Sequence, residues 1–179
     1  MIEETLDLIR KRRTIRRFTD QEVRQEQVET LLEMAMCAPS RLNRQPWHFV
    51  VIHDKALQRQ ICDTCQGHPH YVEQAPLLIA VCADPAESPT WMMDISAAAE
   101  NLLLAATAMG LGGVWFGSPD TTFWLKMEAL LKDALDVPQH IRIPTMLAIG
   151  YPDEELPPHG KHDRFARGKV HYGKWGELR

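Results

Sequence analysis

The sequence predicts one α+β domain over residues 1–179, with a small central sheet flanked by helices. Segments with helical spacing of apolar residues alternate with short apolar or β-branched runs, and no repeat or long linker divides the chain. A length of 179 residues suits one domain with a substantial core. The composition, 45% hydrophobic and 25% charged, is that of an ordinary globular protein.

Helical spacing is clearest in the segment that ends before Pro39. Val28, Leu31, Leu32 and Ala35 recur at i, i+3, i+4 and i+7, and the proline stops the helix. The segment 91–109 carries apolar residues on both sides, so we expect a long helix that is buried nearly all round. Further helices are predicted around residues 2–9, 57–65 and 121–135.

Four short runs predict the strands. Residues 47–52 are aromatic and β-branched, and residues 77–82 form a continuous apolar run, as in a strand buried on both faces. Glycines at 110–113 end the long helix and precede a strand at 114–116, and the last strand is predicted at 145–150. The tail, residues 151–179, is rich in Pro, Gly, His and basic residues and has no helical period.

The charge balance disfavours two classes of partner. Lys and Arg number 20 against 24 Asp and Glu, a formal net charge of −4, which argues against a general nucleic-acid or membrane-surface binder. No apolar run is long enough to span a bilayer, and Glu3 and Glu4 make the N-terminus unlike a secretory leader. We therefore expect a cytoplasmic protein whose cysteines are reduced.

A cluster of six cations lies between Arg10 and Arg17. One interpretation is a solvated helix end, where cations suit the helix dipole. Nucleic-acid contact is a second, which the acidic chain disfavours. A specific phosphate site is a third, because the planar fork of arginine binds phosphate oxygens bidentately.

The loop 39–47 contains Ser40, Asn43 and Gln45 between a predicted helix and a predicted strand. These side chains both donate and accept hydrogen bonds, as recognition of a planar heterocycle requires, but for the loop alone a well-capped turn is the favoured explanation. The segment 110–117 lacks the G-x-G-x-x-G fingerprint, although Gly117 could let the backbone approach a flat ligand closely.

Cys62 and Cys65, followed by His68 and His70, could supply four zinc ligands. The spacing is compressed, however, and Cys65 belongs to the apolar stripe of its predicted helix. A thioredoxin-like pair would open a helix, whereas this pair closes one. We expect structural thiols and no metal site.

Several motifs together resemble the FMN-dependent nitroreductase family. Residues 12–16 read RRTIR, and residues 38–47 read APSRLNRQPW, in the family's order and at its distance. Further matches are AAENL at 98–102, GLG at 110–112 and AIGYP at 148–152. The resemblance extends over nearly the whole chain.

The resemblance implies an α+β fold, an intertwined homodimer, and two FMN sites built from both subunits at the interface. It also implies NADH or NADPH as co-substrate and no catalytic side chain, because the flavin carries the redox chemistry. The implied FMN-binding residues are Arg12, Arg13, Thr14 and Arg16; Pro39, Ser40, Arg41, Asn43 and Gln45 of the loop; Trp115, Phe116 and Gly117; and Lys161 and Arg164 of the tail.

Two positions depart from the family pattern. Many members have Lys two residues before the tail arginine, where this chain has His162 beside Lys161, and Arg41 replaces a residue that is often small. The resemblance implies acceptors such as nitroaromatics and quinones. The alternatives are other flavin chemistry, such as reductive dehalogenation or flavin breakdown, and an FMN- or metal-binding protein without turnover.

Overall fold

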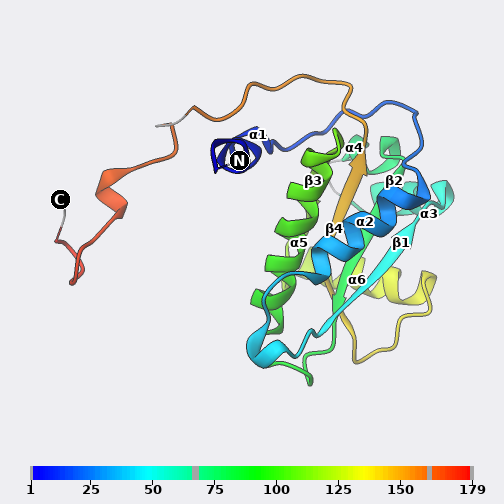
Figure 1. The fold of residues 1–179 in the computed structure, drawn as a ribbon. Coiled ribbons are helices and arrows are strands. Elements are labelled where there is room, and N and C mark those ends of the chain that lie inside the picture. The colour runs from blue at the N-terminus through cyan, green and yellow to red at the C-terminus, as the bar shows by residue number, and fades with distance from the viewer. Residues whose placement is uncertain (1, 66–68, 161–162, 178–179) are drawn as a thin grey trace.

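The computed structural model describes residues 2–65, 69–160 and 163–177. Its centre is a four-stranded antiparallel sheet in the order β1-β2-β4-β3 (Figure 1). The α+β class with a small sheet flanked by helices is thus confirmed. The strands are β1 (Trp47–Ile52), β2 (Leu77–Ala83), β3 (Gly112–Phe116) and β4 (Arg142–Gly150).

Helices cover both faces of the sheet. One face packs against α2 (Gln25–Met36) and α5 (Trp91–Ala108), which share a hydrophobic cluster with Ile79 and Leu147 of the sheet. The other face packs against α3 (Lys55–Thr64), α4 (His70–Gln74) and α6 (Thr122–Ala134), which share a second cluster with Ala80 and Met146.

Strand β2 explains why the run 77–82 shows no alternation of polar and apolar residues. Its seven residues are all buried. Leu77, Ile79 and Val81 belong to the α2–α5 cluster, whereas Leu78 and Ala80 belong to the opposite cluster. The prediction of a strand buried on both faces is therefore confirmed, and the helices on each side supply the physical reason.

Some predicted boundaries need correction. Strand β4 begins at Arg142 rather than at 145, and β3 begins at Gly112 rather than at 114. The five-residue helix α4 was not predicted. The expectation that the helix at 91–109 is buried nearly all round is wrong for one chain, because Met93 is 72% exposed. The α2–α5 cluster and the sheet cover only part of α5, and its remaining side is open.

Two segments lie at the margin of this body. Helix α1 (Ile2–Lys11) contains no buried residue, and Ile2, Leu6 and Ile9 all present exposed apolar side chains. The last described segment, which includes the short 3-10 turn η2 (Arg167–Lys169), extends away from the sheet (Figure 1). Within it Trp175 is 91% exposed. None of the helices in the described part of the chain has the length and apolar character needed to cross a bilayer.

Candidate functional site

A cavity of about 410 Å³ lies where the chain after α1 meets the beginning of the tail. The cavity brings together the four arginines that were predicted to bind phosphate, although Arg164 lies far along the chain from Arg12, Arg13 and Arg16. The lining residues are Arg12, Arg13, Thr14, Arg16, Glu154, Leu156, His159 and Arg164.

The arginine segment is held in place by two apolar anchors. Ile15 and Phe18 are buried in the core, and the Ile15 N–H donates to the Gly113 carbonyl at 3.0 Å. A Cβ at position 112 would lie 2.5 Å from Ile15 Cγ1, so the glycine there permits this close approach. Burial of Ile15 leaves the neighbouring arginine side chains free to line the cavity.

The tail forms the opposite wall by running alongside the arginine segment. The Glu154 carboxylate accepts the backbone N–H groups of Arg16 (2.5 Å) and Arg17 (3.1 Å), and the Arg13 guanidinium donates to the Pro157 carbonyl. The His159 N–H donates to the Arg10 carbonyl at 3.0 Å. These hydrogen bonds place His159 and Arg164 beside the arginines.

The cavity is strongly cationic. Arg12, Arg13, Arg16 and Arg164 face one lining carboxylate, Glu154, which the two backbone amides already engage. Glu100 of α5 lies 3.5 Å from Arg12 Nε and forms an ion pair with it. A phosphate dianion supplies the charge and the multiple acceptors that such a donor set matches, so the cavity fits the phosphate of FMN.

Arg164 and His159 interact directly inside the cavity. The guanidinium Nε lies 3.4 Å from His159 Nδ1, and Nη2 lies 3.2 Å from Nε2. Partial burial and the nearby charges of Arg164, Arg13 and Arg12 lower the pKa of His159 from its ordinary value of 6.5. Sequence reasoning missed His159, because a single histidine in a loop belongs to no motif.

The loop 39–45 lies elsewhere in the same chain. Figure 1 shows it beside the first turn of α5, whereas α1 lies near the other end of that helix. The Arg41 N–H donates to Asp94 Oδ1 at 3.2 Å, which attaches the loop there. The cavity lining contains none of Pro39, Ser40, Arg41, Asn43 and Gln45.

Within the loop, the polar side chains hold one another. The Ser40 hydroxyl accepts the Gln45 N–H at 3.0 Å, and Asn43 Oδ1 accepts from Gln45 Nε2 at 2.9 Å. Leu42, Asn43 and Gln45 have φ values of 51°, 57° and 50°, a conformation that is costly for Leu and Gln. The capped-turn explanation is thus correct locally, while the backbone stores strain of the kind often found at binding sites.

Trp115, Phe116 and Gly117 lie in a third region, apart from the arginine cavity and the loop 39–45. Trp115 is 39% exposed, and Phe116 makes edge-on ring contacts with Tyr71 (centroids 6.1 Å apart) and Trp124 (5.3 Å). A Cβ at position 117 would lie 2.6 Å from the Pro144 carbonyl oxygen. Packing against β4 therefore explains Gly117 without any ligand. Lys161 and His162 lie outside the described residues.

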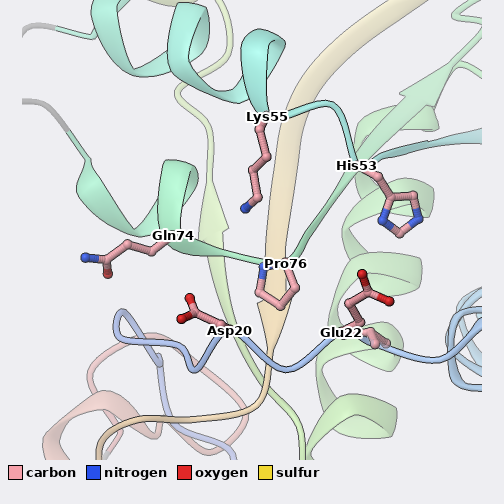
Figure 2. Close-up of a pocket in the computed structure, with 7 residues that line it drawn as sticks. Asp20, Glu22, His53, Lys55, Gln74 and Pro76 are labelled. Carbon is pink, nitrogen blue, oxygen red and sulfur yellow. The ribbon is translucent and has the colours of Figure 1, made fainter.

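A second and larger cavity, of about 520 Å³, lies near the start of β2 and has mixed charge (Figure 2). Asp20 and Glu22 line it opposite Lys55, whose ammonium group donates to the carbonyls of Glu73 (2.9 Å) and Ala75 (2.7 Å). Because this cation is already engaged and two carboxylates lie nearby, the cavity suits an anionic phosphate less well than the arginine cavity does.

The cysteine pair lies in the core rather than at either cavity. Cys62 and Cys65 are buried in the hydrophobic cluster beneath α3, and burial raises the pKa of Cys65 to about 11. Cys62 Sγ donates to the Pro69 carbonyl at 3.5 Å. His70 is exposed, and His68 lies outside the described residues.

Comparison with known proteins identifies the family. The model of the nitroreductase family matches residues 9–71 and 65–151. A candidate NADH dehydrogenase/NAD(P)H nitroreductase of Archaeoglobus fulgidus is 36% identical over 97% of this chain and 100% of its own length. An iodotyrosine deiodinase of Thermotoga neapolitana is 28% identical over 90% of this chain and 95% of its own.

Solved structures agree in fold. An FMN-dependent nitroreductase of Clostridium difficile superposes with a TM-score of 0.87 at 28% identity, and the match covers 95% of this chain and 99% of that one. The arginine segment, the Gly112 contact and the antiparallel sheet all lie within the matched region. On these grounds the chain belongs to the nitroreductase family.

Proposed function

We propose that this protein is an FMN-dependent oxidoreductase that takes hydride from NADH or NADPH and reduces a small acceptor such as a nitroaromatic or a quinone. The observation that carries this proposal is the arginine cavity, in which Arg12, Arg13, Arg16 and Arg164 converge on a space of about 410 Å³. The names of the Archaeoglobus and Clostridium relatives, which refer to NAD(P)H and to FMN, support the same chemistry.

The chain's own residues would bind and orient the cofactor. The guanidinium groups of the cavity would hold the phosphate, and Thr14 offers a hydroxyl beside them. Ser40, Asn43 and Gln45 would recognise the edge of the flavin ring, with Trp115 and Phe116 near its plane. Bound FMN would supply the redox chemistry, so no acid–base side chain is required.

The test is direct. Purified protein should be yellow and should release FMN, not FAD, on denaturation, and it should oxidise NADH or NADPH when acceptors are added. A colourless protein that does not bind added FMN contradicts the proposal. A yellow protein that oxidises neither nicotinamide with any acceptor supports a binding protein without turnover instead.

We also propose an intertwined homodimer, because one chain keeps its candidate flavin-binding groups apart. The loop 39–45 lies near the start of α5, away from the arginine cavity, and a second copy could bring its own loop to that cavity. An apolar groove of about 390 Å³ supports this interface, since α1, α2 and α5 leave it open. Its lining includes Leu8, Met34, Leu104, Ala105, Ala108 and Met109.

Disrupting the apolar groove should both separate the two subunits and weaken FMN binding. Leu104→Asp places a charge in the apolar groove, and we expect a monomer with weak FMN binding. Leu125→Asp, at an exposed position of α6, is the matched control and should remain dimeric. Light scattering gives the mass and fluorescence titration gives the affinity. A monomeric wild type with tightly bound FMN would contradict the dimer.

Reductive dehalogenation is a second candidate reaction, because the Thermotoga relative is named an iodotyrosine deiodinase. Its substrate would enter the same flavin site. Anaerobic incubation with reduced protein and a halophenol, followed by analysis of released halide, separates this reaction from nitro or quinone reduction. Product analysis under air tests flavin breakdown. The four free cysteines support a reducing, cytoplasmic setting for either reaction.

The cysteine pair should be dispensable for function. We expect the Cys62→Ser/Cys65→Ser variant to keep FMN affinity and turnover while losing about 1–3 kcal/mol of stability, because a hydroxyl is buried in an apolar cluster. Of the single variants, Cys62→Ser should cost less, since its hydroxyl can donate to the Pro69 carbonyl. Asp63→Ser, at an exposed position of the same helix, is the control. Stoichiometric zinc in the wild type that is lost in the double variant would overturn this expectation.

A further inference from the structure

His159 occupies an unusual position for a histidine. It lines the cavity together with Arg12, Arg13 and Arg164, and its backbone N–H is held by the Arg10 carbonyl at 3.0 Å. The guanidinium of Arg164 lies within 3.4 Å of Nδ1 and 3.2 Å of Nε2. A neutral imidazole has one ring nitrogen with a free lone pair, so it accepts from Arg164 at either Nδ1 or Nε2, according to its tautomer. The imidazolium can accept at neither nitrogen, so a hydrogen bond from Arg164 to this ring needs the neutral form.

We propose that His159 is a proton-dependent ligand of the phosphate group, neutral when the cavity is empty and protonated when a phosphate monoester dianion occupies it. The inference rests on the proposed function, because it assigns the cavity to the FMN phosphate. It adds a residue that the family motifs do not indicate, and it makes cofactor affinity depend on pH.

The charges around the ring supply the physical reason. Partial burial and the guanidinium groups of Arg164, Arg13 and Arg12 lower the pKa of His159, and Asp163 opposes them. Arg16 and Glu154 are the other charged groups that line the cavity among the described residues. A phosphate dianion in the cavity adds negative charge beside the ring, so it favours the imidazolium.

Protonation also changes the hydrogen bonding. The imidazolium takes one proton from solvent and has two N–H donors, one of which can bind a phosphate oxygen. It can no longer accept from Arg164, whose guanidinium is then free to turn to the same phosphate. The two side chains thus exchange a contact with each other for charge-assisted contacts with the ligand.

The sign of the pH dependence follows from linkage. The His159 pKa is below 6.5 in the free protein and is expected to rise when the dianion binds. Binding therefore takes up a proton between these two pKa values, and affinity increases as the pH falls through this window. The FMN phosphate, whose second pKa is about 6, acts in the opposite direction. A cationic site favours its dianion, so binding releases a proton from the phosphate and this part of the affinity increases as the pH rises.

The experiment compares FMN binding by the wild type and by His159→Gln, which keeps a polar side chain but does not titrate. When the pH is lowered from 8 to 6.5, we expect the FMN affinity of the wild type to increase about fivefold or more relative to that of the variant. Uptake of one proton can change the affinity by at most about tenfold per pH unit, so this gain lies within the limit. His140→Gln, at an exposed position outside the cavity lining, is the control and should follow the wild type. Riboflavin, which lacks the phosphate, should show no such difference.

Calorimetry gives an independent readout that needs no variant. FMN titrations at pH 7.5 in buffers of different ionisation enthalpy should reveal net proton uptake, whereas titration of the FMN phosphate alone would release protons. Parallel pH profiles for wild type and His159→Gln, or net proton release, overturn the role of His159 while leaving FMN binding intact. A wild type that binds no FMN overturns the proposed function and this inference together. If His159→Gln does not fold, the direction of wild-type proton exchange decides.

Discussion

Arg12→Ala is expected to weaken FMN binding by about 1.5–3 kcal/mol, roughly 10- to 150-fold in Kd, the range for hydrogen bonds to a charged group. The Arg12 guanidinium lines the cavity and is about three-quarters buried, so solvent screens it less than it screens an exposed arginine. Arg12→Lys should fall between wild type and alanine, because lysine keeps the charge but lacks the planar fork.

Arg17→Ala is the matched control for this variant. Arg17 belongs to the same segment, but its side chain donates to the Asp153 carbonyl and does not line the cavity. We expect its FMN affinity to stay within about twofold of wild type, since exposed surface pairs contribute little. Fluorescence quenching of FMN at fixed ionic strength measures both. Unchanged affinity in Arg12→Ala would place the phosphate outside this cavity.

Glu128→Ala is expected to give the largest loss of stability, about 3 kcal/mol, because it leaves two buried or partly buried cations without their carboxylate. Glu128 of α6 accepts from Arg142 Nε (2.8 Å) and from the Ile143 N–H (2.9 Å), and it lies 3.3 Å from Lys132 Nζ. The group joins α6 to the start of β4, and none of its three side chains lines the arginine cavity. FMN affinity of the folded variant should therefore be unchanged.

The same carboxylate gives this stability a pH dependence. Burial raises the pKa of Glu128, but the hydrogen bonds from Arg142 and Ile143 and the charges of Arg142 and Lys132 outweigh it, so the pKa is lowered below 4.5. A lowered pKa in the folded state stabilises the protein at pH above the unfolded value, and this contribution is lost as the pH falls through the folded value. The difference between wild type and Glu128→Ala should shrink below about pH 4.5.

Urea unfolding at fixed protein concentration measures both effects, since the stability of the proposed dimer would depend on concentration. Asp133→Ala, at an exposed position of the same helix, should change the free energy of unfolding by less than about 0.5 kcal/mol. Equal stabilities for Glu128→Ala and Asp133→Ala would show that the ion pairs contribute nothing net.

The sequence by itself determined most of the helices and strands, and it indicated the arginine segment of the candidate site. The period of Val28, Leu31 and Ala35 located α2, and the apolar run before Cys82 located β2, because burial on one or two faces leaves a direct mark on residue type. The clustered cations at 10–17 left three interpretations open, and the resemblance to the nitroreductase family favoured a phosphate site among them. Cys65 was assigned to the core from its place in an apolar stripe.

Only the tertiary structure decided which distant residues meet. Arg164 and His159 reach Arg12 because the tail runs along the arginine segment, where the N–H groups of Asp153 and His159 donate to the carbonyls of Arg17 and Arg10. These backbone hydrogen bonds depend on no residue pattern. The loop 39–45 stays at the other end of α5 because the Arg41 N–H is bound to Asp94. Local periodicity records which face of an element is buried, but contacts between elements depend on the path of the whole chain. For that reason the sequence predicted the arginines of the site, and the fold alone revealed the histidine among them.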